Sequence, residues 1–316
     1  MRPLIIALAI WLLLGADQAD PTPQIFNLTD QRFPPAEITI GADGSAWMTE
    51  LGGHRIARAA LDGTVVFFSL PEPRSQLQGI ARGADGNSWF TETETRDGSH
   101  NYVGRITPSG QIRTFPVPRD NAFLMGIVAG PDGNMWFTEF GAHRVGRITP
   151  LGITTEYTLP EERAAPQTIV VGPDKNLWTN GRHEVFRIST AGRISAFPVT
   201  SARSGLRNVA WSGGPVLWAT EYDSTDLLRI EMNGKVTRFS QPEHRVGVIY
   251  LRPGRNGEAL TIDMDNGAIA TITAGGNIVD RYRLPFDYPA NAVAQAPGGR
   301  LWFTVFATNS FGWIDP

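Results

Sequence analysis

The stretch PDGNMWFTEFGAHRVGRITPLGITTEYTLP, residues 131–160, contains most of one structural unit of this chain. Its Asp-Gly pair predicts a tight hairpin turn, because both residues tolerate the positive φ angles that such turns need. A Trp-Phe-Thr-Glu strand follows, then a polar loop, a Val-Gly-Arg-Ile-Thr strand, a Leu-Gly turn and an outer strand that ends at a proline. With the short apolar strand 126–129 in front, the unit holds four strands.

The tryptophan of this unit recurs along the whole chain. Successive copies are 42, 47, 42, 40, 42 and 42 residues apart, at Trp47, Trp89, Trp136, Trp178, Trp218, Leu260 and Trp302. Copies of about forty residues with four strands each are typical of a β-propeller. We therefore predict an all-β fold, a seven-bladed β-propeller with four-stranded blades. Because the tryptophan is periodic, we expect it to fill the space between neighbouring sheets rather than to stack on a carbohydrate.

The two ends of the chain predict how the ring closes. The last copy stops at Pro316 after its third strand, so its outer strand is missing. Residues 22–29 look like an outer strand without a blade. We predict that this N-terminal strand pairs with the last blade and closes the ring, which leaves no open sheet edge at the seam. Residues 20–316 would then form a single propeller domain.

The first residues resemble a secretory signal peptide. Arg2 precedes an apolar run from Leu4 to Leu14, and small residues follow it as far as Ala19. The run is too short to span a bilayer. The chain has no cysteine, which excludes disulfides and a lipid anchor on cysteine. We expect residues 1–19 to be a signal peptide and the remainder to be periplasmic or secreted, without a membrane anchor.

Composition and charge narrow the class of partner. The chain is 41% hydrophobic and 19% charged, which is typical of soluble globular proteins, and its net charge of −3 gives no reason to expect nucleic acid. The mouth of the central channel is the largest concave feature of a propeller. We therefore expect a monomer that binds a small-molecule or peptide-like ligand at this channel.

Five copies end their second strand in a carboxylate, on the face where the loops surround the channel. These residues are Glu50, Glu92, Glu139, Glu221 and Asp263. Because carboxylate oxygens bind hard cations, we expect Mg²⁺ or Ca²⁺ and no organic cofactor, with Glu139, Glu221 and Asp263 as ligands and Glu50 and Glu92 as further candidates. The recurrence of the position favours a framework role instead, in which each carboxylate bonds to backbone N–H groups or to an arginine of the next strand.

The histidines fall into two groups. Four of them occupy a shared position near the end of the loop between the second and third strands, which favours a structural role: His54, His100, His143 and His183. His244 lies in the loop that leads into the sixth blade and has no counterpart in other copies, so it is the candidate general base. No nucleophile elbow, phosphate loop or His-Glu-x-x-His motif is present.

Residues 131–160 closely resemble the repeat of the virginiamycin B lyases, also called streptogramin B lyases. The similarity runs over the whole mature chain and is strongest from Gly83 to Pro160. The resemblance implies a seven-bladed propeller that opens a cyclic depsipeptide antibiotic at its ester by Mg²⁺-dependent elimination rather than by hydrolysis.

The resemblance also locates the family's chemistry in the last two blades. It implies one histidine before the sixth blade, a Glu-Pro-His-Gly-Ile motif before the seventh, and a glutamate after the last Trp-Phe. These positions fall on Val246, Pro289 and Asn291, and on Val305 or Phe306. None keeps the family's residue. His244 and Asp287 lie nearby, and together with Asn291 they are the candidate catalytic residues.

Three functions are compatible with these observations. The first is an exported lyase of this type that acts on an ester or lactone through a divergent site. The second is a non-catalytic propeller that binds a peptide, glycan or protein on its channel face. The third is a Ca²⁺-dependent lactonase, in which acidic and amide side chains around the axis hold the ion. The fold alone does not choose among them.

Overall fold

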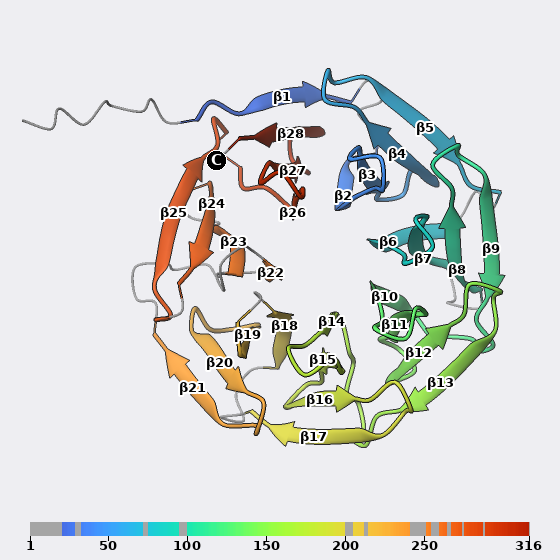
Figure 1. Ribbon diagram of the computed structural model, residues 1–316, viewed down its shortest axis with the longest axis vertical. Helices are drawn as coiled ribbons and strands as arrows, with labels where there is room; N and C mark the ends of the chain where they lie inside the picture. The colour runs from blue at the N-terminus through green and yellow to red at the C-terminus, as the bar shows by residue number, and fades with distance from the viewer. Residues whose placement is uncertain are drawn as a thin grey trace, which may run out of the picture.

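The computed structural model describes residues 21–28, 33–71, 75–94, 100–199, 205–211, 214–240, 251–253, 259–263, 267–273, 275–286 and 288–315. These residues form seven four-stranded antiparallel sheets arranged around a central axis (Figure 1). The predicted seven-bladed propeller is confirmed. In the described part of the chain no helix is long and apolar enough to cross a membrane.

Blades 1 to 6 each run from an innermost to an outermost strand in chain order, and blade 7 takes its outermost strand from the N-terminal end of the chain. Blades 1 and 2 contain β2 (Pro35–Ile40), β3 (Ala46–Glu50), β4 (Arg55–Ala59), β5 (Val65–Ser69), β6 (Ser75–Arg82), β7 (Ser88–Glu94), β8 (Asn101–Ile106) and β9 (Ile112–Pro116). Blades 3 and 4 contain β10 (Leu124–Ala129), β11 (Met135–Glu139), β12 (Arg144–Ile148), β13 (Thr154–Thr158), β14 (Ile169–Val171), β15 (Leu177–Asn180), β16 (Glu184–Ile188) and β17 (Ile194–Pro198). Blades 5 and 6 contain β18 (Leu206–Trp211), β19 (Val216–Glu221), β20 (Leu227–Glu231), β21 (Val236–Phe239), β22 (Leu251–Pro253), β23 (Ala259–Asp263), β24 (Ala268–Ile272) and β25 (Ile278–Arg283). Blade 7 contains β26 (Ala292–Gln295), β27 (Leu301–Val305), β28 (Ser310–Ile314) and β1 (Gln24–Asn27).

The N-terminal strand closes the ring as predicted. β1 pairs antiparallel with β28, from Gln24 opposite Trp313 to Asn27 opposite Ser310. The ring of Phe26 stacks on Phe311 with centroids 5.4 Å apart, which adds an apolar contact to the backbone pairing. Strands from the two ends of the chain therefore complete one sheet, and the seam has no unpaired edge.

The repeated tryptophans fill the space between blades. All six are at most 2% exposed, and each packs against the first strands of the following blade. Trp136 of blade 3, for example, shares a cluster with Ile169 and Leu177 of blade 4. Burying a side chain of this size, about 200 Å², is a large hydrophobic contribution at every junction. The predicted packing role is confirmed.

The Asp-Gly turn serves this packing as well as reversing the chain. In blade 3, Asp132 Oδ1 accepts hydrogen bonds from the backbone N–H of Asn134 at 3.3 Å and from Trp136 Nε1 at 3.0 Å. Blades 2 and 4 repeat the contact between turn aspartate and indole. The motif thus fixes the turn and satisfies a buried indole N–H at once.

The threonine that follows the Trp-Phe pair connects neighbouring blades. Thr49 Oγ1 donates to Gln78 O of blade 2 at 3.1 Å, and Thr138 Oγ1 donates to Gln167 O of blade 4 at 3.2 Å. The same contact recurs from blade 2 to blade 3 and across the seam from blade 7 to blade 1. The innermost strands of blades 7, 1, 2, 3 and 4 are therefore linked to one another around this part of the axis.

Candidate functional site

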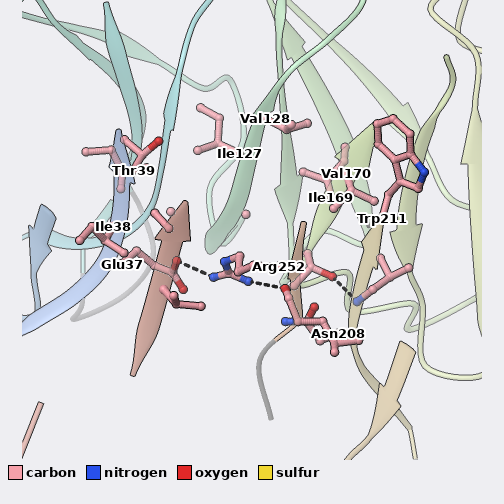
Figure 2. A pocket seen from close by; sticks show the side chains of 18 of the residues that line it. Glu37, Ile38, Thr39, Ile127, Val128, Ile169, Val170, Asn208, Trp211 and Arg252 are labelled. Carbon is pink, nitrogen blue, oxygen red and sulfur yellow. Dashed lines mark hydrogen bonds and ion pairs between the residues drawn. The ribbon is translucent and has the colours of Figure 1, made fainter. Parts of the chain in front are cut away.

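The innermost strands enclose a cavity of about 760 Å³ along the propeller axis (Figure 2). Strands β2, β6, β10, β14, β18, β22 and β26 all contribute to its wall. Much of that wall is aliphatic and includes Ile38, Ile127, Ile169 and Val209. Ligand sites typically have volumes of about 300–1,000 Å³ and apolar walls with a few placed polar groups. The channel is therefore the candidate binding site.

The two ends of the cavity differ in character. Glu37, Asn208 and Arg252 lie together toward one end, whereas Trp211 lies at the other end (Figure 2). Glu37 and Asn208 come early in β2 and β18, so we call this end the upper end; Trp211 is the last residue of β18. The upper end carries most of the polar chemistry of the channel.

An ion pair crosses the upper end of the cavity. Arg252 Nη2 lies 2.6 Å from Glu37 Oε2, and Arg252 Nη1 donates to Leu251 O at 3.0 Å. Glu37 belongs to blade 1 and Arg252 to blade 6, so the pair reaches past blade 7. Both side chains are about a quarter exposed, at 28% and 24%, which leaves them accessible to solvent in the channel.

Blades 4 and 5 supply further polar groups at this end. Asn208 is 3% exposed, and its Oδ1 has no hydrogen-bond partner among the described residues. The guanidinium of the adjacent Arg207 lies over the ring of Tyr222, 5.4 Å from the centroid. Gln167 Nε2 donates to the hydroxyl of that tyrosine. The unsatisfied acceptor of Asn208 is the clearest sign of a ligand contact, because buried polar groups in proteins are normally paired.

The five repeated carboxylates are buried within their blades, and the residues that line the cavity do not include them. Glu50 forms a two-contact ion pair with Arg55, and Glu221 Oε2 lies 2.5 Å from Arg238 Nη1. These two therefore have the framework contacts that recurrence favours. Glu92 and Asp263 are equally buried, at 1% and 3% exposure.

Glu139 differs from Glu50 although both have an arginine five residues later. Among the described residues its two carboxylate oxygens have no hydrogen-bond partner, and Arg144 instead lies 3.6 Å from Glu156. Burial, and then the negative charge of Glu156, raise the pKa of Glu139 to about 8, against the opposing effect of Arg144 and Arg119. Glu139 is therefore largely protonated at neutral pH, and a protonated carboxyl is a poor ligand for a hard cation.

The residues that the structure describes do not assemble a metal site. No group of three or more His, Asp or Glu side chains among them could hold an ion. Glu139, Glu221 and Asp263 belong to blades 3, 5 and 6, and the first two have the buried or ion-paired environments given above. The described residues thus do not fit a divalent cation, and their role as metal ligands stays a prediction.

Two of the four grouped histidines have a backbone reason for their shared position. His54 and His143 have φ angles of 49° and 58°, and Asn309 of blade 7 has 52° at the equivalent position. This left-handed conformation is unfavourable for most residues and is enriched in Asn, Asp and His. His143 Nδ1 also accepts a hydrogen bond from Ala165 N at 3.2 Å. The structural interpretation of His54 and His143 is confirmed.

Comparison with known proteins agrees with this architecture. The model of the virginiamycin B lyase family matches residues 21–206 and 179–316. The chain belongs to the virginiamycin B lyase family. A crystal structure of virginiamycin B lyase from Staphylococcus aureus is 27% identical with a TM-score of 0.82, covering 93% of this chain and 99% of the other. A catalytically inactive variant of that enzyme with quinupristin gives the same values. A streptogramin B lyase structure is 24% identical with a TM-score of 0.81, covering 93% and 97%. No match is found among curated protein sequences.

The positions that carry the chemistry of virginiamycin B lyases by resemblance are only partly described. His244, Asp287 and Val246 lie outside the described residues. Asn291 is described: its Oδ1 accepts from Phe306 N at 2.5 Å, and its own N–H donates to Thr304 O at 2.7 Å. The side chain thus fastens the end of β27 to the loop before β26. An amide fixed in this way is not a base.

The last of these positions in the family repeat is also changed. Val305 is fully buried at the end of β27, and the following Phe306 is exposed. Neither carries a titratable group. In the described part of blade 7, the residues at these positions therefore provide no group for proton transfer.

Sequence reasoning did not identify Glu37. It occupies the position at which blades 2 and 3 have Gly79 and Gly126, since all three donate their N–H to the threonine of the second strand. A charged residue that replaces a repeated glycine beside the channel is a departure from the repeat that could have been noticed. Its partner Arg252 begins the sequence Arg-Pro-Gly-Arg-Asn-Gly, residues 252–257, which resembles an insert in the sixth repeat and is a second departure.

Proposed function

We propose that this member of the virginiamycin B lyase family is an exported carbon–oxygen lyase that acts on an ester or lactone through a site different from the one its resemblance implies. The match of the family model over residues 21–316 is the observation that carries the proposal. The intact seven-bladed ring and the cavity on its axis support it, because they preserve the scaffold and a ligand-sized site. The apolar run after Arg2 supports export.

The reaction requires one base. An elimination removes a proton from the carbon next to the one that bears the ester oxygen, the released electron pair forms a carbon–carbon double bond, and the carbon–oxygen bond breaks to release a carboxylate. His244 is the candidate base, since an imidazole titrates near neutral pH. Asn291 has no such capacity. Glu139 could accept a proton only above about pH 8, and it is buried away from the channel.

A divalent cation is part of the proposal only as an expectation from the resemblance. It would stabilise the negative charge that develops on the ester carbonyl. The described residues do not gather ligands for it. Calorimetric titration of the mature chain with Mg²⁺ and Ca²⁺ tests the expectation, and Glu221→Gln tests one predicted ligand.

Mass spectrometry distinguishes the reaction classes. The mature chain is incubated with a cyclic depsipeptide and with simple lactones. Elimination opens a ring without changing its mass and introduces a double bond, whereas hydrolysis by a lactonase adds one water. We expect a linear isomer that is lost in His244→Ala and retained in His100→Ala, an exposed histidine of the repeat. A product with added water contradicts the lyase.

The second candidate function is a non-catalytic propeller that binds its ligand at the channel face. It takes account of the Asn291 side chain, which is engaged with Phe306 N, and of Val305, which offers no carboxylate. In this case the depsipeptide or another ligand would bind with measurable affinity and remain chemically unchanged. Binding without turnover of any tested ester would support this binding function and contradict the lyase.

A further inference from the structure

We propose that the upper end of the channel binds a terminal carboxylate together with its neighbouring amide, as in the C-terminus of a peptide or another N-acyl amino acid. The first observation is Asn208, whose Oδ1 is buried in the cavity wall without a partner among the described residues. A buried acceptor of this kind is normally paired with a donor. A ligand N–H entering the channel would provide that donor.

The charges of the cavity wall select an anionic ligand. The upper end of the cavity is lined by Arg207 and Arg252 together with one described carboxylate, Glu37, which leaves an excess of one positive charge. A concave site with one sign of charge concentrates ligands of the opposite sign. Arg207 and Arg252 come from neighbouring blades and lie at the upper end with Asn208, whereas Arg82 ends β6 and lies at the opposite end.

Arg252 already binds a carboxylate, that of Glu37. The contact of 2.6 Å and the partial exposure of both side chains show a guanidinium that is accessible from the channel and oriented toward an acid. A guanidinium has five N–H donors, and Glu37 and Leu251 O together use only some of them. Glu37 and a ligand carboxylate would therefore share or compete for Arg252.

The combination of groups defines the ligand class. In an N-acyl amino acid the carboxylate and the amide N–H belong to one residue, so the first can reach Arg252 while the second donates to Asn208 (Figure 2). The aliphatic wall provided by Ile38 and Ile127 suits a small apolar side chain. An inorganic anion would use only the arginines. Carboxylate binding at this end of the channel does not require catalysis, although opening an ester by elimination also releases a carboxylic acid.

Isothermal titration calorimetry of the mature chain with N-acetyl-alanyl-alanine, and with the same dipeptide as its C-terminal amide, tests the proposal. We expect the acid to bind at least about tenfold more tightly than the amide, because a charge-assisted hydrogen bond is stronger than a neutral one. Equal affinity for the two probes, or binding of neither, would overturn the proposal.

Variants locate the site. The double change Glu37→Gln with Arg252→Gln replaces the ion pair by two amides of similar size and should abolish the preference for the acid. Asn208→Ala should weaken binding of the acid several-fold. Arg82→Gln, at the opposite end, should leave that binding unchanged. Thermal unfolding checks that each variant folds.

Glu37→Gln alone gives the sharpest result. It removes the competing carboxylate and leaves Arg252 in place, so it should tighten binding of the acid several-fold. A gain of affinity does not arise from misfolding. Weaker binding by Glu37→Gln would mean that the ion pair only connects blades 1 and 6, and the assigned site would be wrong.

Discussion

Blades 3 and 7 have the same apolar parts but different polar ones. Trp136 and Trp302 are both fully buried between sheets, and Thr138 and Thr304 both donate to a carbonyl of the next blade. Three other positions differ. The Asp132, Glu139 and His143 of blade 3 are replaced in blade 7 by Gly298, Val305 and Asn309.

The exchange of Asp132 for Gly298 changes the hydrogen bonding of the buried indole. Trp136 Nε1 donates to Asp132, whereas Trp302 Nε1 is buried without a partner among the described residues, as is Trp218 Nε1 of blade 5. The blade therefore forms from side-chain volume and backbone pairing alone, and the polar groups of the motif are additions that a blade can lose. The repeat therefore specifies the ring through packing, which leaves polar positions free to vary.

Truncation of the two tryptophans should have the largest effect. Trp136→Ala leaves a cavity between blades 3 and 4 and is expected to cost about 3–5 kcal/mol of unfolding free energy. Trp302→Ala loses similar volume but also removes an unsatisfied N–H, so it should cost about 1 kcal/mol less. Urea unfolding of both variants measures the difference. Equal or reversed costs would contradict the idea that the indole hydrogen bond distinguishes the blades.

Substitution of Glu139 should have the next largest effect on stability, and this effect should depend on pH. Its pKa is raised from 4.5 to about 8 by burial and by Glu156, so its contribution to stability is complete below about pH 4.5 and is lost as the pH rises toward 8. Glu139→Gln keeps the shape of the protonated carboxyl. This variant should match the parent chain in acid and be more stable at pH 8.

The matched control is Glu50→Gln in blade 1. That carboxylate is ion-paired with Arg55, so the same substitution should destabilise the chain at neutral pH. Chemical unfolding at several pH values follows both variants. If the two substitutions change stability in the same direction at pH 8, the different environments assigned to the two carboxylates are wrong.

Substitution of the turn residue, Asp132 in blade 3 and Gly298 in blade 7, should change stability moderately and in opposite directions in the two blades. Asp132→Ala removes the acceptor of Trp136 and should cost about 1–3 kcal/mol. Gly298→Asp places an acceptor four residues before Trp302, where a Cβ meets no atom within 4 Å, and should stabilise the chain by about 1 kcal/mol. Melting temperatures report both changes. A destabilising Gly298→Asp would show that blade 7 cannot accept the blade 3 contact.

The smallest effect on stability is expected at His143, which has a left-handed backbone conformation in the loop between the second and third strands of blade 3. His143→Asn introduces the residue that blade 7 has there and should change stability by less than about 0.5 kcal/mol. His143→Ala introduces a residue that disfavours this conformation and should lower the free energy of unfolding by about 1 kcal/mol. Thermal unfolding compares them. Equal losses for the two substitutions would indicate that the hydrogen bond to Ala165 N, and not the backbone, selects histidine.

The candidate site was less predictable than the ring. The spacing of a tryptophan every forty-odd residues identified the blades, and the missing outer strand identified the closing segment, because both follow from local periodicity. Glu37 and Arg252 are far apart in sequence and belong to blades that are not neighbours, so no local pattern joins them. His244 and Asp287 remain predictions from the sequence.

Two of the repeated carboxylates are followed by an arginine five residues later, and they separate what the repeat predicts from what depends on the folded structure. The repeat alone places Glu50 and Glu139 at the ends of equivalent buried strands, because it sets strand order and register. Their ion pairing depends on the folded structure. The outer strand presents Phe67 in blade 1, which leaves Arg55 to Glu50, but Glu156 in blade 3, which draws Arg144 away from Glu139. Ion pairing depends on distances and competing charges in three dimensions, and sequence spacing does not contain them.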